Sequence, residues 1–301
     1  MANQNLHEPA LKRFIGLATR KLIKCFSKTL YVKLQYRYIT HHKLNLKNPT
    51  RYTEKLQYLR LYLYPKDPRV SKCASRDGLR QYAKELGLSE YLIPSYGIFN
   101  HFEDLDLNMI PLPFVLKCTH ASSYNYFCFE KDDIKYDIMK RQFIKWLKTN
   151  YGKKTVEMHY SKIPPRIIAE KILLENEQLP IEYKIHVFNG KAKYLYVVTG
   201  RGQNIRYTNL LTNWQRFDGA QFNGWKSADI TPLKPHNFDE MIAIAEKLAA
   251  PFPFVRVDFF NINGRIFLNE MTFTPAKGTL IFDDDKCDFE IGKWLDINTK
   301  S

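Results

Sequence analysis

Two acidic residues lie within otherwise apolar sequence near the end of the chain. Residues 253–278 contain two hydrophobic runs on either side of Asn263-Gly264, and each run carries one carboxylate, Asp258 or Glu270. Strand-forming residues around an Asn-Gly pair predict a β-hairpin. A carboxylate inside such a strand must be paired or bind a metal, because an isolated buried charge is unfavourable. These two carboxylates are therefore the first candidates for chemistry.

The length of the hairpin loop decides whether the two carboxylates meet. Side chains alternate across a strand, so a one-residue change in loop length moves a residue to the opposite face. A two-residue turn pairs Asp258 with Asn269. A loop with an odd number of residues pairs Asp258 with Glu270, and it pairs Arg256 with Thr272. We expect the odd loop, which places two oxygen ligands for Mg²⁺ beside a guanidinium that can bind phosphate. The alternative is an Arg-Asp pair and a solvent-facing glutamate on a half-exposed hairpin.

The net charge is the most unusual bulk property of the chain. Its 301 residues include 46 Lys and Arg against 31 Asp and Glu, which gives a formal net charge of +15. A hydrophobic content of 45% is ordinary for a globular protein of one or two domains. The charge predicts an anionic partner: a nucleotide, an acidic glycan, a nucleic acid or an anionic membrane surface.

Cysteine usage and hydropathy bear on the location of the protein. The five cysteines are scattered without metal-ligand spacing, which predicts reduced thiols and a cytoplasmic location. We find no apolar run near the roughly 20 residues that span a bilayer, and no signal-peptide pattern. Residues 11–33 repeat apolar residues at helical spacing among basic residues and contain no acidic residue. Such a helix either lies on the anionic inner face of the cell membrane or packs its apolar stripe on the protein body.

The middle of the chain predicts a mixture of helices and strands. Residues 70–88 predict one helix that ends at Gly87, and residues 132–149 predict another. Short strands are expected at residues 114–118, 125–129 and 166–174. Residues 200–232 are rich in Asn, Gly and Thr, and we expect an ordered loop that closes on substrate.

Residues 181–199 predict a second hairpin around Asn189-Gly190. With a two-residue turn, the core face carries Tyr183, Ile185 and Val187 together with Ala192, Tyr194, Tyr196 and Val198. The opposite face carries the residues that could do chemistry, which are Glu182, Lys184 and His186.

Taken in order, these segments resemble the TupA-like family of the ATP-grasp superfamily, which is associated with bacterial surface-polysaccharide biosynthesis. The resemblance covers roughly residues 45–297. It rests on several stretches that occur in order, including NPTRYTEKLQYLRLY, PLPFVLKCTH, PRIIAEKIL, EYKIHVFNGK, KPHNFDEMIAIAEKLA, VRVDFFNINGRIFLNEMTFTP and FEIGKWL. Each stretch alone is weak, but the ordered set is specific.

The resemblance implies an α+β fold of the ATP-grasp type, in which two α+β lobes grip a nucleotide between antiparallel sheets. We accordingly divide the chain into three parts. Residues 1–69 form a basic helical N-terminal region, and residues 70–175 form the N-lobe with a hinge. Residues 176–301 form the C-lobe, with the metal and phosphate site and the substrate loop.

The resemblance also implies roles for individual residues. Lys117 and Lys184 would contact phosphate oxygens of ATP, and Arg256 would bind the γ-phosphate. Glu170 and Lys171 would lie at the hinge near the adenine and ribose.

Further residues complete the implied site. Asp258 and Glu270 would coordinate Mg²⁺. The phosphate loop of the family usually contains glycine, but this chain has Ser122 and Ser123 there, whose hydroxyls can replace amide donors. Glu182 stands where the family usually has Asp.

The usual reaction of the superfamily predicts an ATP-dependent carboxylate-amine ligase. A uronic acid or amino acid would be activated as an acyl phosphate and captured by an amine, with Arg256, Lys184 and Arg201 in catalytic roles. Arg201 is a candidate clamp for a substrate carboxylate or phosphate. The alternatives are a sugar kinase or glycosyltransferase of the same pathway, such as capsule or O-antigen synthesis, and a non-catalytic acidic-glycan-binding protein. The expected partners are a nucleotide and an acidic sugar, glycan or lipid-linked glycan. A nucleic acid is disfavoured because no RNA- or DNA-binding motif is present.

Overall fold

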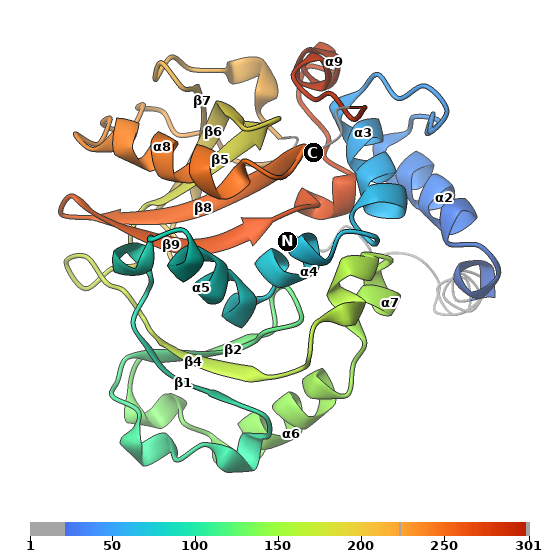
Figure 1. Cartoon of the computed structure of the whole chain (residues 1–301). Coiled ribbons are helices and arrows are strands. Elements are labelled where there is room, and N and C mark those ends of the chain that lie inside the picture. The colour runs from blue at the N-terminus through green and yellow to red at the C-terminus, as the bar shows by residue number, and fades with distance from the viewer. Residues whose placement is uncertain (1–21, 223, 299–301) are drawn as a thin grey trace.

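Two antiparallel sheets form the body of the protein (Figure 1). The computed structural model describes residues 22–222 and 224–298. The four-stranded sheet has the order β1-β4-β2-β3, with strands Ser95–Phe99, Ile167–Lys171, Phe114–Cys118 and Asn125–Cys128. The five-stranded sheet has the order β7-β6-β5-β8-β9, with strands Arg206–Leu211, Lys191–Thr199, Glu182–Phe188, Phe254–Ile262 and Arg265–Thr272. The strands predicted at 114–118, 125–129 and 166–174 are confirmed, and all three belong to the four-stranded sheet.

Helices cover the outer faces of both sheets and fill the space between them. Helix α8 (Phe238–Ala249) packs on β5, β6 and β8, and α6 (Tyr136–Leu147) packs on β2. Helices α4 (Pro68–Ala74) and α5 (Arg76–Glu85) lie between the sheets in Figure 1 and contact β9. The other helices are α2 (Lys28–Thr40), α3 (Tyr52–Tyr58), which continues into a π-helical turn (Leu59–Leu63), α7 (Tyr151–Thr155) and α9 (Lys286–Lys293). No helix among the described residues is long and apolar enough to cross a membrane.

The single helix predicted over residues 70–88 is wrong, because two helices meet there at an angle. Helix α4 ends at Ala74, Ser75 is extended (φ −80°, ψ 139°), and α5 begins at Arg76. A Cβ at Gly78 would lie 2.2 Å from the carbonyl oxygen of Lys72, so this close approach of α5 to α4 requires glycine. The break directs Arg76 toward the five-stranded sheet.

The hairpin between β8 and β9 pairs Asp258 with Glu270 and Arg256 with Thr272, as predicted. The odd loop expected to produce this register is wrong. The turn has two residues, Asn263 and Gly264, because Ile262 pairs with Arg265. A β-bulge at Asn269 supplies the extra residue that shifts the register between Phe259 and Asp258.

The hairpin between β5 and β6 uses the same combination of turn and bulge. Its two-residue turn at Asn189-Gly190 is confirmed, since Phe188 pairs with Lys191. The register then shifts at Lys193, so that the remaining β6 residues change faces. The predicted grouping of Tyr194, Tyr196 and Val198 with the core face is therefore wrong, because these residues lie opposite His186, Lys184 and Glu182.

Residues 200–232 are more ordered than a loop. They contain β7, the edge strand of the five-stranded sheet, and a 3-10 helical turn at Asp218–Ala220. Asn209 on β7 donates a hydrogen bond from Nδ2 to Gln221 Oε1 at 2.8 Å, which fastens the returning chain to the sheet. The sequence prediction missed β7 because the composition of residues 200–232 as a whole is typical of a loop.

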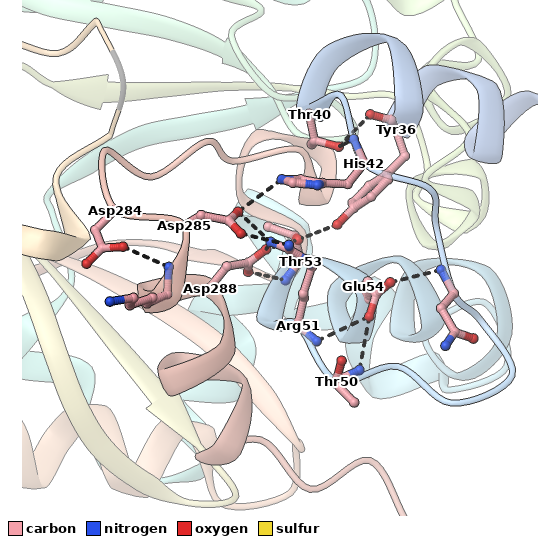
Figure 2. Close-up of polar contacts among 12 residues, drawn as sticks. Tyr36, Thr40, His42, Thr50, Arg51, Thr53, Glu54, Asp284, Asp285 and Asp288 are labelled. Atoms are coloured by element: carbon pink, nitrogen blue, oxygen red, sulfur yellow. Dashed lines mark hydrogen bonds and ion pairs between the residues drawn. The ribbon is translucent and has the colours of Figure 1, made fainter.

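The described part of the N-terminal region is attached to α9 by a polar network (Figure 2). Arg51 forms a bidentate ion pair with Asp285 at 2.6 and 2.8 Å. Thr53 donates to the Asp288 carboxylate from its hydroxyl at 2.6 Å and from its backbone N–H at 2.9 Å. The Tyr36 hydroxyl lies 2.7 Å from Thr53 Oγ1, which connects α2 to the same network. The domain boundaries after residues 69 and 175 stay predictions.

His159 is a buried histidine whose two ring nitrogens have no hydrogen-bond partner in the described structure. It lies among aromatic rings, with Tyr64, Tyr160 and Phe273 at centroid distances of 6.1, 4.5 and 6.2 Å. Burial, with Arg60 nearby, lowers the pKa of His159 from 6.5 to about 3. Its neutral state therefore contributes stability that is fully present above pH 6.5 and is lost as the pH falls toward 3.

We predict that His159→Phe keeps or raises stability at pH 8 and reduces the loss of stability in acid. The unfolded wild-type chain takes up a proton at residue 159 below pH 6.5 and the variant cannot. The slope of unfolding free energy against pH should decrease by up to about 1.4 kcal/mol per pH unit. Urea denaturation between pH 4 and pH 8 measures this slope, with His101→Gln as a control because His101 is exposed. An unchanged slope for His159→Phe would contradict the lowered pKa of His159.

Candidate nucleotide site

Four polar residues form a continuous row across one face of the five-stranded sheet. Tyr196 on β6 pairs with Lys184 on β5, Lys184 pairs with Asp258 on β8, and Asp258 pairs with Glu270 on β9. We call Tyr196, Lys184, Asp258 and Glu270 the polar row. Both bulges are needed for this alignment, because each one shifts the register of its hairpin by one residue.

Asp258 is the most buried member of the polar row, with 1% of its surface exposed. Arg256 donates to its two oxygens from Nε at 2.6 Å and from Nη2 at 2.7 Å, and Lys184 Nζ donates at 2.5 Å. Burial alone would raise the pKa of Asp258, but Arg256 and Lys184 outweigh burial and lower it below its ordinary value. Asp258 therefore stays ionised beneath two cations.

Glu270 has a different cation. Arg76, at the start of α5, donates from Nη2 to Glu270 Oε2 at 3.0 Å, and Thr272 donates from Oγ1 to Oε1 at 3.1 Å. Burial would raise the pKa of Glu270, but Arg76 outweighs burial and lowers it. Burial would lower the pKa of Arg76, but Glu270 and, next, Glu170 of the other sheet outweigh burial and raise it.

Glu170 is the buried carboxylate of the four-stranded sheet. Lys117 on β2 pairs with it at 2.8 Å, and Arg80 Nη1 lies 3.4 Å from its other oxygen. Burial would raise the pKa of Glu170, but Lys117 outweighs burial and the pKa is lowered. The place of Glu170 near the adenine and ribose stays a prediction, and in this structure its carboxylate pairs with Lys117.

A cavity of about 310 Å³ lies between the two sheets and brings most of the predicted residues together. The predicted residues that line it are Lys117, Ser122, Ser123, Lys171, Glu182, Lys184, Arg201 and Glu270. The predicted residues outside this lining are Glu170, Arg256 and Asp258, which contact the lining lysines or share their sheet face. Segments far apart in the sequence thus converge on one space.

Two predicted residues have informative local geometry at this cavity. Ser123 adopts a left-handed backbone conformation with φ 64°, which glycine usually provides. The loop therefore adopts a left-handed conformation at Ser123 although it contains no glycine. Glu182 pairs with Lys184 Nζ at 2.7 Å and with Arg201 Nε, so Arg201 is attached to the site through a carboxylate.

Sequence reasoning missed Arg76 and Asn269 as lining residues. The sequence does not distinguish Arg76 from the many other basic residues. Only the extended residue Ser75 between α4 and α5 turns its side chain toward the five-stranded sheet. Asn269 entered the prediction only as the partner of Asp258 for a two-residue turn, whereas in the structure it is the bulge residue and lines the cavity beside Glu270. A pattern of alternation cannot show a bulge, because the extra residue interrupts the alternation itself.

The charge of the lining favours an anion. Five basic side chains line the cavity, which are Arg76, Lys117, Lys171, Lys184 and Arg201. The acidic side chains in the same lining are Glu182 and Glu270. A surplus of cations in a partly enclosed space attracts and orients polyanions such as phosphates.

The oxygen donors at the polar row fit a magnesium ion. Mg²⁺ commonly uses one or two protein carboxylates together with phosphate oxygens and water. Glu270 lines the cavity and Asp258 is its direct cross-strand neighbour. Among the described residues, no cluster of three or more His, Cys, Asp or Glu could hold a metal by protein ligands alone. The donor set therefore fits an ion that is bound together with phosphate, and Glu270 is the more exposed of the two carboxylates, because both Asp258 oxygens already bind Arg256 and Lys184.

A family model described as TupA-like ATPgrasp matches residues 54–296. Because the match covers most of the chain, the protein belongs to the TupA-like ATP-grasp family. The ATP-grasp fold class predicted from the sequence, with two antiparallel sheets and flanking helices, is confirmed.

Several solved structures resemble the chain at low identity. A D-alanine–D-alanine ligase from Bacillus anthracis complexed with ATP is 12% identical, with a TM-score of 0.40 and coverage of 68% of this chain and 55% of that chain. An ADP complex of N5-carboxyaminoimidazole ribonucleotide synthetase is 14% identical, with a TM-score of 0.47 and coverage of 81% and 57%. The chain thus spans little more than half the length of these two structures. No curated protein sequence matches it.

We predict that Arg76→Met destabilises the protein by up to about 3 kcal/mol, because it leaves the half-buried Glu270 carboxylate without its cation. The double variant Arg76→Met/Glu270→Gln should recover part of this loss, since the uncompensated charge is then absent. Arg69→Met is the matched control, because Arg69 pairs with Asp67 at an exposed site and should cost less than about 1 kcal/mol. Urea denaturation measures these three variants together with Glu270→Gln alone, which completes the double-mutant cycle. Strictly additive effects in the double variant would show that Arg76 and Glu270 do not interact.

Proposed function

We propose that this protein is an ATP- and magnesium-dependent enzyme, most consistent with a carboxylate-amine ligase. The observation that carries the proposal is the cavity between the two sheets, into which Lys117 projects from one sheet and Lys184 from the other. Membership of an ATP-grasp family supports the nucleotide as the ligand.

The lining residues suit the parts of ATP. Five basic side chains can neutralise phosphate oxygens, and their partial burial strengthens each interaction relative to bulk water. Residues 172–181 connect the two sheets, and Ile172, Leu173, Leu179 and Pro180 of this connection line the cavity. This apolar wall, together with Lys171, suits a planar base.

Mg²⁺ held by Glu270 and Asp258 would neutralise the phosphates and orient them for in-line transfer. Arg256 already bonds Asp258, Tyr196 and Thr272, so its guanidinium is fixed before any ligand arrives. Such fixed cations stabilise developing charge without reorganisation. Ser122 and Ser123 can donate hydroxyl hydrogen bonds to phosphate oxygens from the opposite wall.

The ligase reaction needs a place for an anionic substrate. Arg201 lines the cavity with 39% of its side chain exposed, so it can bind a second carboxylate or phosphate while Glu182 orients it. We therefore propose an acidic sugar, such as a uronic acid, or an amino acid as the activated substrate. The carboxylate would attack the γ-phosphorus as ADP leaves, and an amine would then displace phosphate to form the amide.

We propose that this reaction belongs to the synthesis of a bacterial surface polysaccharide, such as capsule or O-antigen, on a glycan or lipid-linked glycan. We propose that it takes place in the cytoplasm, at the inner face of the cell membrane. Support for the pathway comes from family membership, and support for a peripheral location comes from the basic N-terminal region.

We predict that Lys117→Met and Lys184→Met each weaken binding of a non-hydrolysable ATP analogue by about 1–3 kcal/mol, which is about 5- to 150-fold in Kd. Each change removes one cation from the lining. Lys193→Met is the control, because Lys193 is exposed at the bulge of β6. Isothermal titration calorimetry compares the variants after circular dichroism has confirmed that each is folded.

The same experiment with Asp258→Asn and Glu270→Gln should show loss of the magnesium-dependent part of binding. Equal affinities throughout would contradict the nucleotide site.

We predict that the protein releases ADP only with a carboxylate substrate, and that added hydroxylamine is converted to a hydroxamate. Hydroxylamine captures an acyl phosphate in place of the natural amine, so the product identifies the reaction class. Uronic acids and amino acids are the substrates to screen, with Glu270→Gln as the inactive control. ADP release with a phosphorylated sugar hydroxyl and no hydroxamate would favour a sugar kinase instead.

A further inference from the structure

Helix α2 presents two faces of different chemistry. Its inward face is buried in a small core, where Val32 and Tyr36 pack with Leu44 and Val156. Its outward face carries apolar side chains one turn apart, which are Leu30, Leu34 and Tyr38, with exposures of 48, 46 and 62%. Residues four apart lie one above another on a helix, so these three form an exposed apolar ridge. We call them the α2 ridge.

The apolar surface continues into the helical turn before α2. Leu22 and Phe26 are 60% and 86% exposed. Fifteen large hydrophobic residues are exposed in the described structure, and five of them fall within residues 22–38. Single exposed hydrophobic residues are normal, but such a concentration marks an interaction surface.

The charge around the α2 ridge has one sign. No acidic residue occurs between Glu8 and Glu54. Basic residues of the described segment before Glu54 are Lys24, Lys28, Lys33, Arg37, Lys43, Lys47 and Arg51, of which Arg51 is neutralised by Asp285. Lys33 and Arg37 are exposed and lie on the outward half of α2, and neither forms an ion pair with another described residue. The surface therefore combines apolar side chains with unneutralised positive charge.

This combination identifies the partner. A second copy would bring the same positive surface against the first and would be repelled. A nucleic acid satisfies the charge, but it offers no apolar phase for leucine side chains. The interface of an anionic bilayer satisfies both, because aliphatic and aromatic side chains enter the acyl boundary while flanking bases meet the lipid headgroups.

We propose that the α2 ridge and its flanking bases dock the protein on an anionic phospholipid bilayer. The inward face of α2 stays packed in its core and connected through Tyr36 to Thr53, so docking needs no rearrangement of the fold. The proposal does not depend on the nucleotide site. It shifts the expected membrane segment from residues 11–33 toward α2, and residues 11–21 lie outside the described residues.

Co-sedimentation of the full-length protein with vesicles tests this docking. The vesicles are phosphatidylcholine alone, or phosphatidylcholine with one quarter phosphatidylglycerol. We expect binding to the anionic vesicles only, and weaker binding as salt is raised. Leu30→Gln/Leu34→Gln and Lys33→Gln/Arg37→Gln should each raise the lipid concentration for half-binding at least tenfold. Ile138→Gln/Lys145→Gln, on exposed positions of α6, is the matched control and should bind like the wild type.

Thermal melting of each variant shows whether it is folded. Any one of the following four outcomes would overturn the proposal. Equal binding to neutral and anionic vesicles would remove the role of charge. Wild-type binding by both α2 variants would place membrane contact elsewhere. A dimer that Leu30→Gln/Leu34→Gln converts to monomer in gel filtration would identify a second copy as the occupant. Binding of duplex RNA or DNA, lost in Lys33→Gln/Arg37→Gln without any vesicle binding, would identify a nucleic acid.

Discussion

The Asp258 carboxylate is the charge on which the polar face of the five-stranded sheet depends. Its oxygens bind both Arg256 and Lys184, and these cations then reach Tyr196, Thr272 and Glu182. Removing this one carboxylate would leave the Arg256 guanidinium buried without its paired carboxylate and would leave Lys184 with Glu182 alone, which is unfavourable. The residues of this face therefore act as one network, and no member can be replaced without affecting the others.

The same constraint explains why α5 takes part in the site. Because Asp258 occupies Arg256 and Lys184, Glu270 needs a cation from outside its own sheet, and Arg76 supplies it. The electrostatic effect of Arg76 reaches Glu170 on the other sheet, so a residue between the lobes balances carboxylates on both sides. Nucleotide and metal charges entering this space would meet Arg76, Lys117 and Lys184 already held in place by carboxylates.

The sequence predicted those features that depend on residue type, and it missed those that depend on one residue of spacing. Asn263-Gly264 and Asn189-Gly190 gave the positions of both turns, although the loop length expected at the first was wrong, and the family motifs picked out the carboxylates and lysines that meet at the cavity. The bulges at Asn269 and Lys193 were not predictable, since a bulge arises from strain and pairing across the sheet rather than from local composition. Arg76 was missed for a related reason, because its direction follows from the close packing that Gly78 permits.

The connection between the N-terminal helices and α9 has a consequence for the order in which the protein folds during synthesis. Helix α3 packs on α9 and on the 3-10 turn Pro275–Gly278, which are synthesised more than two hundred residues after it. Arg51 and Thr53 are synthesised more than two hundred residues before Asp285 and Asp288, so their polar contacts with these carboxylates form late. Until α9 is made, α3 lacks this packing partner, and the side chains that it buries against α9 stay exposed to solvent.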